Sequence, residues 1–348
     1  MQVCSGLPIS QGLAAGKIVF LGAQKAAVRQ AVSPQEEQLR FKSAQRQAVD
    51  ALGALYEKAR AELGEKEAEI FSVHQLMAED EDFTDLVSEA IADGAEGVGL
   101  LRSEFLYLGR STYPTEDELF ESYKTVVQAM DGREVIIRTL DIGADKQVGY
   151  FDMPPEDNPA LGLRAIRLCL TRPILFQTQL CAILRASRYG NVGIMFPMVT
   201  GPDELHRLKE ALADAEDVLI ARGERFGPYR VGVMIETPAA VFMSGELAGE
   251  VDFFSIGTND LTQYLLAMDR QNPNLAPFCD PHHPAVLRAI RQTVESAHQA
   301  RCTVGICGEL AADEALTEAF LRLGVDELSV APSRILPLRE TIRSLTLG

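Results

Sequence analysis

The stretch that decides the fold runs from Val231-Gly-Val-Met-Ile-Glu-Thr-Pro238 to Phe253-Phe-Ser-Ile-Gly-Thr-Asn-Asp260. Each half begins with a short, almost wholly apolar run that ends in polar residues and leads into a helical pattern. Strands buried on both faces have this composition, which is typical of parallel sheets covered by helices. The stretch therefore predicts two successive β-α units of a parallel sheet.

The same unit repeats on both sides of this stretch. Further apolar runs alternate with amphipathic stretches at residues 97–101, 134–137, 192–196, 304–306 and 327–330. About 250 residues of alternating β and α structure are typical of a (β/α)8 barrel. We therefore predict an α/β fold, a (β/α)8-type barrel with seven clear strands and no evident eighth. A doubly wound parallel sheet is the alternative.

The N-terminal part differs in composition and predicts an appendage to the barrel. Residues 1–22 contain short apolar runs separated by glycines, which predict one or two strands. A helix with N-terminal capping signals begins at Ser33, and an apolar stripe predicts a second helix over residues 66–92. We therefore divide the chain into a strand and α-helical hairpin within residues 1–92 and a barrel domain over residues 93–348.

Charge and composition exclude several classes of partner. The 348 residues include 33 Lys and Arg against 50 Asp and Glu, a net charge of −17. Such a chain is unsuited to binding nucleic acid or an anionic membrane by general electrostatics. Neither a secretory signal nor an apolar run of about 18 residues is evident, and the cysteines follow no disulfide or zinc spacing. We expect a reduced, cytoplasmic protein with no nucleic-acid or membrane partner.

Polar side chains lie at the ends of the predicted strands and in the loops that follow them, where active sites of such barrels are found. They are Arg102, Arg138, Arg164, Glu236, Asn259, Asp260, Arg270 and Cys307. Arginine binds phosphate and carboxylate groups bidentately, and Mg²⁺ takes one or two carboxylates together with substrate oxygens. We predict a site for a small anion held by arginines, with Glu236 and Asp260 as ligands of a divalent cation.

Simpler structural roles exist for these residue types. A lone arginine at a strand end is usually an ion-pair partner, and Glu236 or Asn259-Asp260 could cap a helix. Cys307 could be a small buried apolar residue. The neighbouring His282 and His283 resemble a metal pair, but adjacent side chains point apart, so we interpret them as part of a solvated loop.

The motifs resemble enzyme I of the bacterial sugar phosphotransferase system, the phosphoenolpyruvate–protein phosphotransferase family. They cover residues 95–107, 137–146, 162–167, 194–198, 234–240, 252–264 and 306–311. Pyruvate phosphate dikinase shares the barrel, but Ala267-Met-Asp-Arg270 is closer to enzyme I. Residues 1–92 resemble the part of enzyme I that docks the carrier protein HPr.

The resemblance implies a role for each candidate residue. Phosphoenolpyruvate would be held by residues of four segments, namely Arg102, Arg138, Asn259, Asp260 and Arg270, with Arg164 assisting at the phosphate. Glu236 and Asp260 would hold Mg²⁺, and Cys307 would protonate the enolate to pyruvate. The resemblance also implies docking of HPr on the N-terminal helices and a homodimer formed through the barrel.

One expected element is absent from the sequence. Enzyme I transfers the phosphoryl group to a histidine in a Gly-Gly-x-x-Ser-His-type motif, and none of the five histidines here has that context. We therefore predict an internally deleted family member that binds phosphoenolpyruvate and Mg²⁺ but carries no phosphohistidine. One alternative is a non-catalytic phosphoenolpyruvate-sensing or dimerisation module that partners an intact enzyme. Another is a damaged barrel whose missing strand is supplied by residues 1–22 or by a neighbouring chain.

Overall fold

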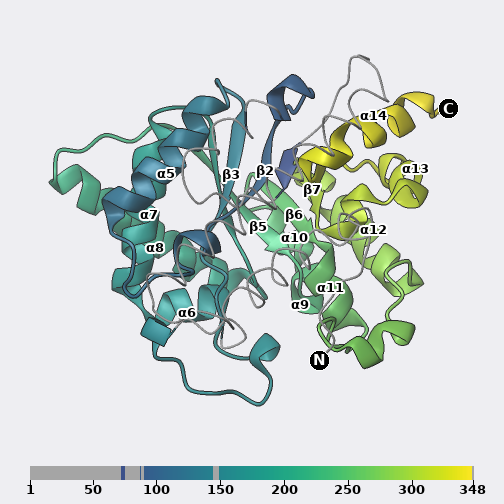
Figure 1. Cartoon of the computed structure of the whole chain (residues 1–348), viewed down its shortest axis with the longest axis horizontal. Coiled ribbons are helices and arrows are strands. Elements are labelled where there is room, and N and C mark those ends of the chain that lie inside the picture. The colour runs from purple at the N-terminus through teal and green to yellow at the C-terminus, as the bar shows by residue number, and fades with distance from the viewer. Residues whose placement is uncertain (1–71, 75–86, 88–89, 144–148, 347–348) are drawn as a thin grey trace, which may run out of the picture. The chain divides into compact units, whose positions relative to one another are not determined.

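Eight parallel strands close into a barrel in the order β1 to β8 (Figure 1). The computed structural model describes residues 72–74, 87, 90–143 and 149–346. The strands are β1 Ser72–His74, β2 Gly97–Arg102, β3 Glu134–Arg138, β4 Val192–Phe196, β5 Tyr229–Ile235, β6 Phe253–Gly257, β7 Thr303–Cys307 and β8 Glu327–Val330. The predicted (β/α)8-type barrel is confirmed, and the doubly wound alternative is excluded because β1 pairs with β8.

Helices follow each strand from β2 onward and surround the barrel (Figure 1). The α-helices are α5 Glu116–Ala129, α6 Ala165–Thr171, α7 Pro173–Ser187, α8 Pro202–Ala221, α9 Pro238–Phe242, α10 Ser244–Ala248, α11 Thr258–Leu265, α12 Pro284–Gln299, α13 Glu314–Leu323 and α14 Ile335–Ser344. The 3₁₀ helices are η1 Glu104–Leu106, η2 Gly149–Phe151, η3 Pro159–Leu161, η4 Pro273–Phe278, η5 Glu309–Ala312 and η6 Pro332–Arg334.

Strand β1 corrects the sequence prediction. Ser72–His74 lies inside the helix predicted over residues 66–92, yet it pairs in parallel with β2 and β8. A three-residue strand leaves no periodic signal in a sequence, because its state is set by neighbours distant along the chain. The expectation that residues 1–22 or a neighbouring chain supply the missing strand is therefore wrong.

The N-terminal prediction is otherwise largely outside the described residues. Residues 87 and 90–92 are helical, as predicted, and the rest of the proposed hairpin and the strand before it are not described. The barrel lies within the unit formed by residues 68–348. The assignment of residues 1–92 to a docking domain stays a prediction, although β1 within that range belongs to the barrel sheet.

A layer of buried apolar side chains fills the lumen of the barrel. It consists of Leu100, Ile136, Met195, Met234, Phe253 and Cys307. The Phe253 ring extends toward β4 and β5, where Gly193 and Gly232 leave room for it, since a Cβ at Gly232 would overlap the ring. Closely packed interiors deform little, so the lumen layer gives rigid support to the polar side chains above it.

Candidate active site

The predicted site residues lie at one end of the barrel, because the carboxyl ends of parallel strands share an edge. Arg102, Arg138 and Cys307 are the last residues of β2, β3 and β7, and Glu236 follows β5 directly. Asn259 and Asp260 lie in the first turn of α11, Arg164 precedes α6, and Arg270 follows α11. We call this end the rim. The rim is where active sites of (β/α)8 barrels lie.

Glu104 joins the two arginines that end β2 and β3. Its Oε2 lies 3.3 Å from Nε of Arg102, and its Oε1 lies 3.0 Å from Nη2 of Arg138. Oε1 also accepts the backbone N–H of Asp141 at 3.0 Å. Glu104 is buried, with 3% of its surface exposed, so it holds both guanidinium groups in a place of low dielectric where charge-assisted bonds are strong.

Asp141 and Asp260 extend this arrangement to the other two arginines. Asp141 Oδ2 lies 3.1 Å from Nη1 of Arg138, and Arg164 Nη2 donates to both Asp141 oxygens at 2.8 and 3.0 Å. Asp260 lies 3.8 Å from Nη2 of Arg164 and 3.5 Å from Nη2 of Arg270.

We call this alternating series the rim ladder; in order it is Arg102, Glu104, Arg138, Asp141, Arg164, Asp260 and Arg270. Burial alone would lower the pKa of Arg138 and Arg164, but the charges of the neighbouring carboxylates outweigh it and raise both pKa values. The arginines therefore stay charged, and the ladder, with four positive and three negative side chains, is close to neutral before any ligand arrives.

Glu236 is the buried carboxylate that the ladder surrounds. Burial raises its pKa above the ordinary value, and the nearby charges of Asp260 and Asp141 raise it further. Its Oε1 accepts the N–H of Met198 at 2.7 Å, and Met198 has a φ of +59°, a strained value for a non-glycine residue. Glu236 is thus held in place by strained backbone, beside a second carboxylate that opposes its ionisation.

A divalent cation fits this pair chemically. The charge of Asp260 raises the pKa of Glu236, and a hard cation between two such carboxylates would remove the repulsion. Within the described ranges no group of three or more His, Cys, Asp or Glu side chains has the arrangement of a metal site. Mg²⁺ is commonly bound by one or two protein carboxylates and takes its remaining ligands from substrate and water, so two carboxylates are sufficient.

Cys307 is held as a protonated thiol. It is buried, and its Sγ–H donates to the carbonyl of Ile256 at 3.5 Å. Burial raises the pKa of the thiol to about 12, an effect partly opposed by a hydrogen bond from Ser255. A group that keeps its proton at neutral pH suits an acid better than a nucleophile.

Asn259 is fixed by the segment that follows Cys307. The backbone N–H of Glu309 donates to Asn259 Oδ1 at 3.0 Å, and Thr258 Oγ1 donates to the Cys307 carbonyl at 2.9 Å. Gly308 makes this close approach possible, because a Cβ there would lie 2.5 Å from Thr258 Oγ1. The ends of β6 and β7 are therefore locked together.

The structure thus brings the predicted residues to one rim and adds others that the sequence prediction gave no role. Glu104 and Asp141 stand two and three residues after the arginines that they pair with, a spacing that was visible in the sequence. Gln179 of α7 supports both strand ends, since its side chain bonds Ser103 Oγ and the N–H of Leu140 at 2.9 Å each. Lys146 of the second motif lies outside the described residues.

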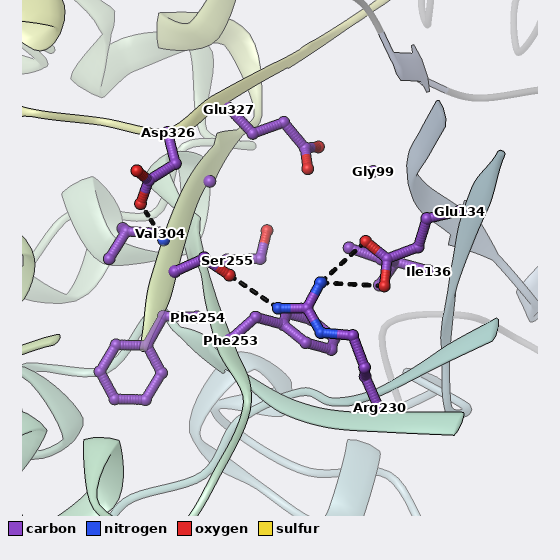
Figure 2. A pocket seen from close by; sticks show the side chains of 12 residues that line it. Gly99, Glu134, Ile136, Arg230, Phe253, Phe254, Ser255, Val304, Asp326 and Glu327 are labelled. Atoms are coloured by element: carbon purple, nitrogen blue, oxygen red, sulfur yellow. Dashed lines mark hydrogen bonds and ion pairs between the residues drawn. The ribbon is translucent and has the colours of Figure 1, made fainter. Parts of the chain in front are cut away.

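A second hollow lies at the opposite, N-terminal end of the barrel, and we call it the floor cavity. Its volume is about 180 Å³, and its lining includes Glu134, Arg230, Ser255, Thr303 and Glu327. Figure 2 shows Arg230 paired with Glu134, whose carboxylate oxygens lie 3.0 and 2.9 Å from Nη1. The lumen layer separates the cavity from the rim.

Comparison with known proteins defines the class. The family model for the PEP-binding domain of PEP-utilising enzymes matches residues 58–347, and that for their N-terminal part matches residues 5–98. The chain therefore belongs to the PEP-utilising enzyme family. The first match begins before β1, in agreement with the strand that completes the barrel.

The relatives within the family are phosphoenolpyruvate-protein phosphotransferases, which confirms the resemblance found in the sequence. That of Geobacillus stearothermophilus is 48% identical over 274 residues, which is 78% of this chain and 47% of the relative. That of Bacillus subtilis (strain 168) is 47% identical over 263 residues, 75% of this chain and 46% of the relative. The chain spans about half the length of the curated relatives that it matches.

A solved structure supports the fold independently. Malate synthase of Haloferax volcanii, in complex with lead(II), superimposes with a TM-score of 0.52 at 16% identity, covering 81% of this chain and 74% of that one. At this identity the likeness concerns the barrel alone. Among the described residues no helix has the length and apolar character needed to cross a membrane.

Proposed function

We propose that this chain binds phosphoenolpyruvate with Mg²⁺ at the rim and carries the part of a phosphoenolpyruvate–protein phosphotransferase that cleaves and forms phosphoenolpyruvate. The observation that carries the proposal is the rim ladder, which gathers four arginines from separate segments around Glu236 and Cys307. Arg102 and Arg270 have the more exposed side chains, at 21% and 31%, and so can contact the substrate directly.

The roles follow from position and charge. Arg102, Arg138 and Arg270, with the backbone and side chain of Asn259-Asp260, hold phosphoenolpyruvate, and Arg164 assists at the phosphate from its bidentate place on Asp141. Glu236 and Asp260 hold Mg²⁺, which when bound offsets the charge that spreads over the moving phosphoryl group.

Cys307 acts on the other end of the substrate. When the phosphoryl group leaves, the enolate carbon takes the proton of the Cys307 thiol and becomes the methyl group of pyruvate. The apolar lumen layer, with Met234 and Phe253 beside Cys307, would keep water from that carbon.

The proposal leaves the phosphoryl acceptor outside this chain. Of the described histidines, His206, His282 and His298 pair with Glu250, Asp313 and Asp326, and His283 caps α12. None of these contacts involves a rim residue. On the resemblance to enzyme I, we propose in addition that the chain works in the cytoplasm as a homodimer formed through the barrel, with HPr docked on the N-terminal region. On its net charge, we propose that it has no nucleic-acid or membrane partner.

Calorimetric titration with phosphoenolpyruvate tests the proposed site. Wild-type protein should bind it in the presence of Mg²⁺, and Arg270→Ala should weaken binding by about 10–100-fold, the effect of losing one charge-assisted contact. Arg322→Ala is the matched control, because Arg322 lies on the surface of α13 and pairs, among the described residues, with Glu318 on the same helix. Absence of wild-type binding with Mg²⁺ refutes the proposal.

Radiolabelled phosphoenolpyruvate tests the predicted lack of a phosphohistidine. After incubation with Mg²⁺ the chain should hold no acid-labile phosphate, and a stable phosphohistidine would contradict that prediction.

The histidine contacts favour one second candidate, a non-catalytic module that senses phosphoenolpyruvate or pairs with an intact enzyme. It predicts binding of phosphoenolpyruvate without hydrogen exchange at the methyl group of pyruvate, and co-purification with a full-length relative.

A further inference from the structure

The floor cavity reaches toward Cys307 from the side opposite the rim. In the sheet register Gly257 of β6 pairs with Cys307 of β7, and Ser255 pairs with Gly305. Residues two apart on a strand share a face, so Ser255 lies one layer below Cys307 on the neighbouring strand. Ser255 and Gly305 both line the floor cavity, as Figure 2 shows for Ser255.

Ser255 is the polar connection between the cavity and the thiol. Ser255 lies near enough to the Cys307 thiol for its side chain to lower the pKa of that thiol, although the thiol itself donates to the carbonyl of Ile256 at 3.5 Å and Ser255 is only 3% exposed. Gly305 has no side chain and is partly exposed, so the lining leaves space up to the level of Ser255. The Ser255 hydroxyl thus lies between Cys307 in the lumen layer and the polar cavity, where it can pass a proton from one to the other.

The cavity itself is suited to water. Its lining carries the carboxylates of Glu134 and Glu327 and the hydroxyl of exposed Thr303, which lies at the N-terminal end of β7. A water molecule occupies roughly 30 Å³ in the liquid, so the 180 Å³ of the cavity accommodates a short chain of them. Polar walls and sufficient volume are the two conditions for such filling.

The proposed chemistry creates a need for this route. After Cys307 has given its proton to the enolate, the thiolate must be reprotonated, and bound substrate covers the rim above it. We propose that Ser255 returns a proton to Cys307 from water in the floor cavity. This inference rests on the proposed function, in which Cys307 is the acid.

The relay conserves protons and electrons. The S–H bond of Cys307 breaks and its proton forms a C–H bond at the enolate carbon, which leaves a thiolate. The Ser255 hydroxyl then gives its proton to the sulfur and takes one from a cavity water, and the hydroxide formed passes to bulk solvent. One water proton is consumed for each pyruvate formed, and no oxidant or reductant takes part.

The relay is tested by the number of deuterons that pyruvate acquires during a single binding event. Protein in D2O is incubated with pyruvate, inorganic phosphate and Mg²⁺, and the methyl group is followed by proton NMR and mass spectrometry. With the relay, the thiol re-equilibrates while pyruvate is bound, so triply deuterated pyruvate appears early without accumulation of the singly deuterated form. In Ser255→Ala the early ratio of singly to triply deuterated pyruvate should rise by on the order of 100-fold, the lower range for a positioned proton-transfer group.

Two further variants separate the relay from a packing effect. Ser255→Thr keeps the hydroxyl and should retain the wild-type pattern, and it serves as the test if the alanine variant does not fold. Ser244→Ala removes a hydroxyl equally buried in α10 and should also leave the pattern unchanged. A wild-type protein that accumulates singly deuterated pyruvate overturns the relay but not the role of Cys307. A wild-type protein that binds pyruvate and exchanges nothing overturns the role of Cys307 and the relay with it.

Discussion

Gly308→Ala is expected to damage the rim far more than one added methyl group suggests. Gly308 has φ +95° and ψ −173°, a backbone region that is essentially restricted to glycine. A Cβ built there lies 2.5 Å from Thr258 Oγ1 and 3.0 Å from Asn259 Oδ1. Both atoms already hold hydrogen bonds to this segment, to the carbonyl of Cys307 and the N–H of Glu309.

The size of the effect follows from two additive costs. A side chain in this backbone region costs about 1–3 kcal/mol, and forcing a methyl group into a packed space costs about 1–3 kcal/mol. Neither Thr258 nor Asn259 can retreat without losing a hydrogen bond to the same segment. We therefore expect the free energy of unfolding to fall by about 2–6 kcal/mol, with weaker binding of phosphoenolpyruvate because Asn259 is displaced.

Urea unfolding followed by circular dichroism measures the first effect, and calorimetric titration with phosphoenolpyruvate and Mg²⁺ measures the second. Gly132→Ala is the control, because Gly132 also has a positive φ, +82°, but a Cβ there meets nothing within 4 Å. It should lose only about 1–2 kcal/mol. A Gly308→Ala protein no less stable than Gly132→Ala, with unchanged binding, would refute this reasoning.

Three shorter predictions concern the lumen and the rim. Because the pKa of Cys307 is raised to about 12, its thiolate fraction grows about tenfold per pH unit below that value. The Cys307-dependent exchange of pyruvate methyl protons, followed by NMR, should therefore rise log-linearly between pH 7 and 10. A plateau of the exchange rate near pH 8 would contradict this. Gly232→Ala should lower the free energy of unfolding by about 1–3 kcal/mol, since its Cβ overlaps the Phe253 ring, and a neutral result in urea would show that the ring is free to move. Glu104→Gln removes a negative charge from the ladder and should strengthen metal-free binding of inorganic phosphate by about tenfold in calorimetry, whereas weaker binding would mean that Glu104 acts only by placing the arginines.

The sequence was informative where a feature is local. Apolar runs such as Phe253-Phe-Ser-Ile predicted seven strands, because burial on both faces dictates composition residue by residue. Their order then placed Arg138 and Cys307 at one rim without any knowledge of side-chain positions, since parallel strands align their ends.

Features that depend on distant partners were not predictable in the same way. Strand β1 is three residues in a helix-like context, and only its pairing with Ser329 and Gly97 makes it a strand. The bonds of Glu104 to two arginines likewise depend on how η1 turns back over the strand ends, which composition does not encode. The conformation of Gly308 belongs to the same group, because its steric limit is set by Thr258, the first residue of α11.

The alternation of the rim ladder also constrains how this protein can change by mutation. Replacing Arg138 alone would leave Glu104 and Asp141 buried with one partner fewer, at a cost of about 3–5 kcal/mol when a buried charge loses its partner. Because neighbouring members share partners, their substitutions will not be additive. The ladder should therefore be inherited as a block, and lineages that lose one of its charges are expected to lose the complementary charge soon after.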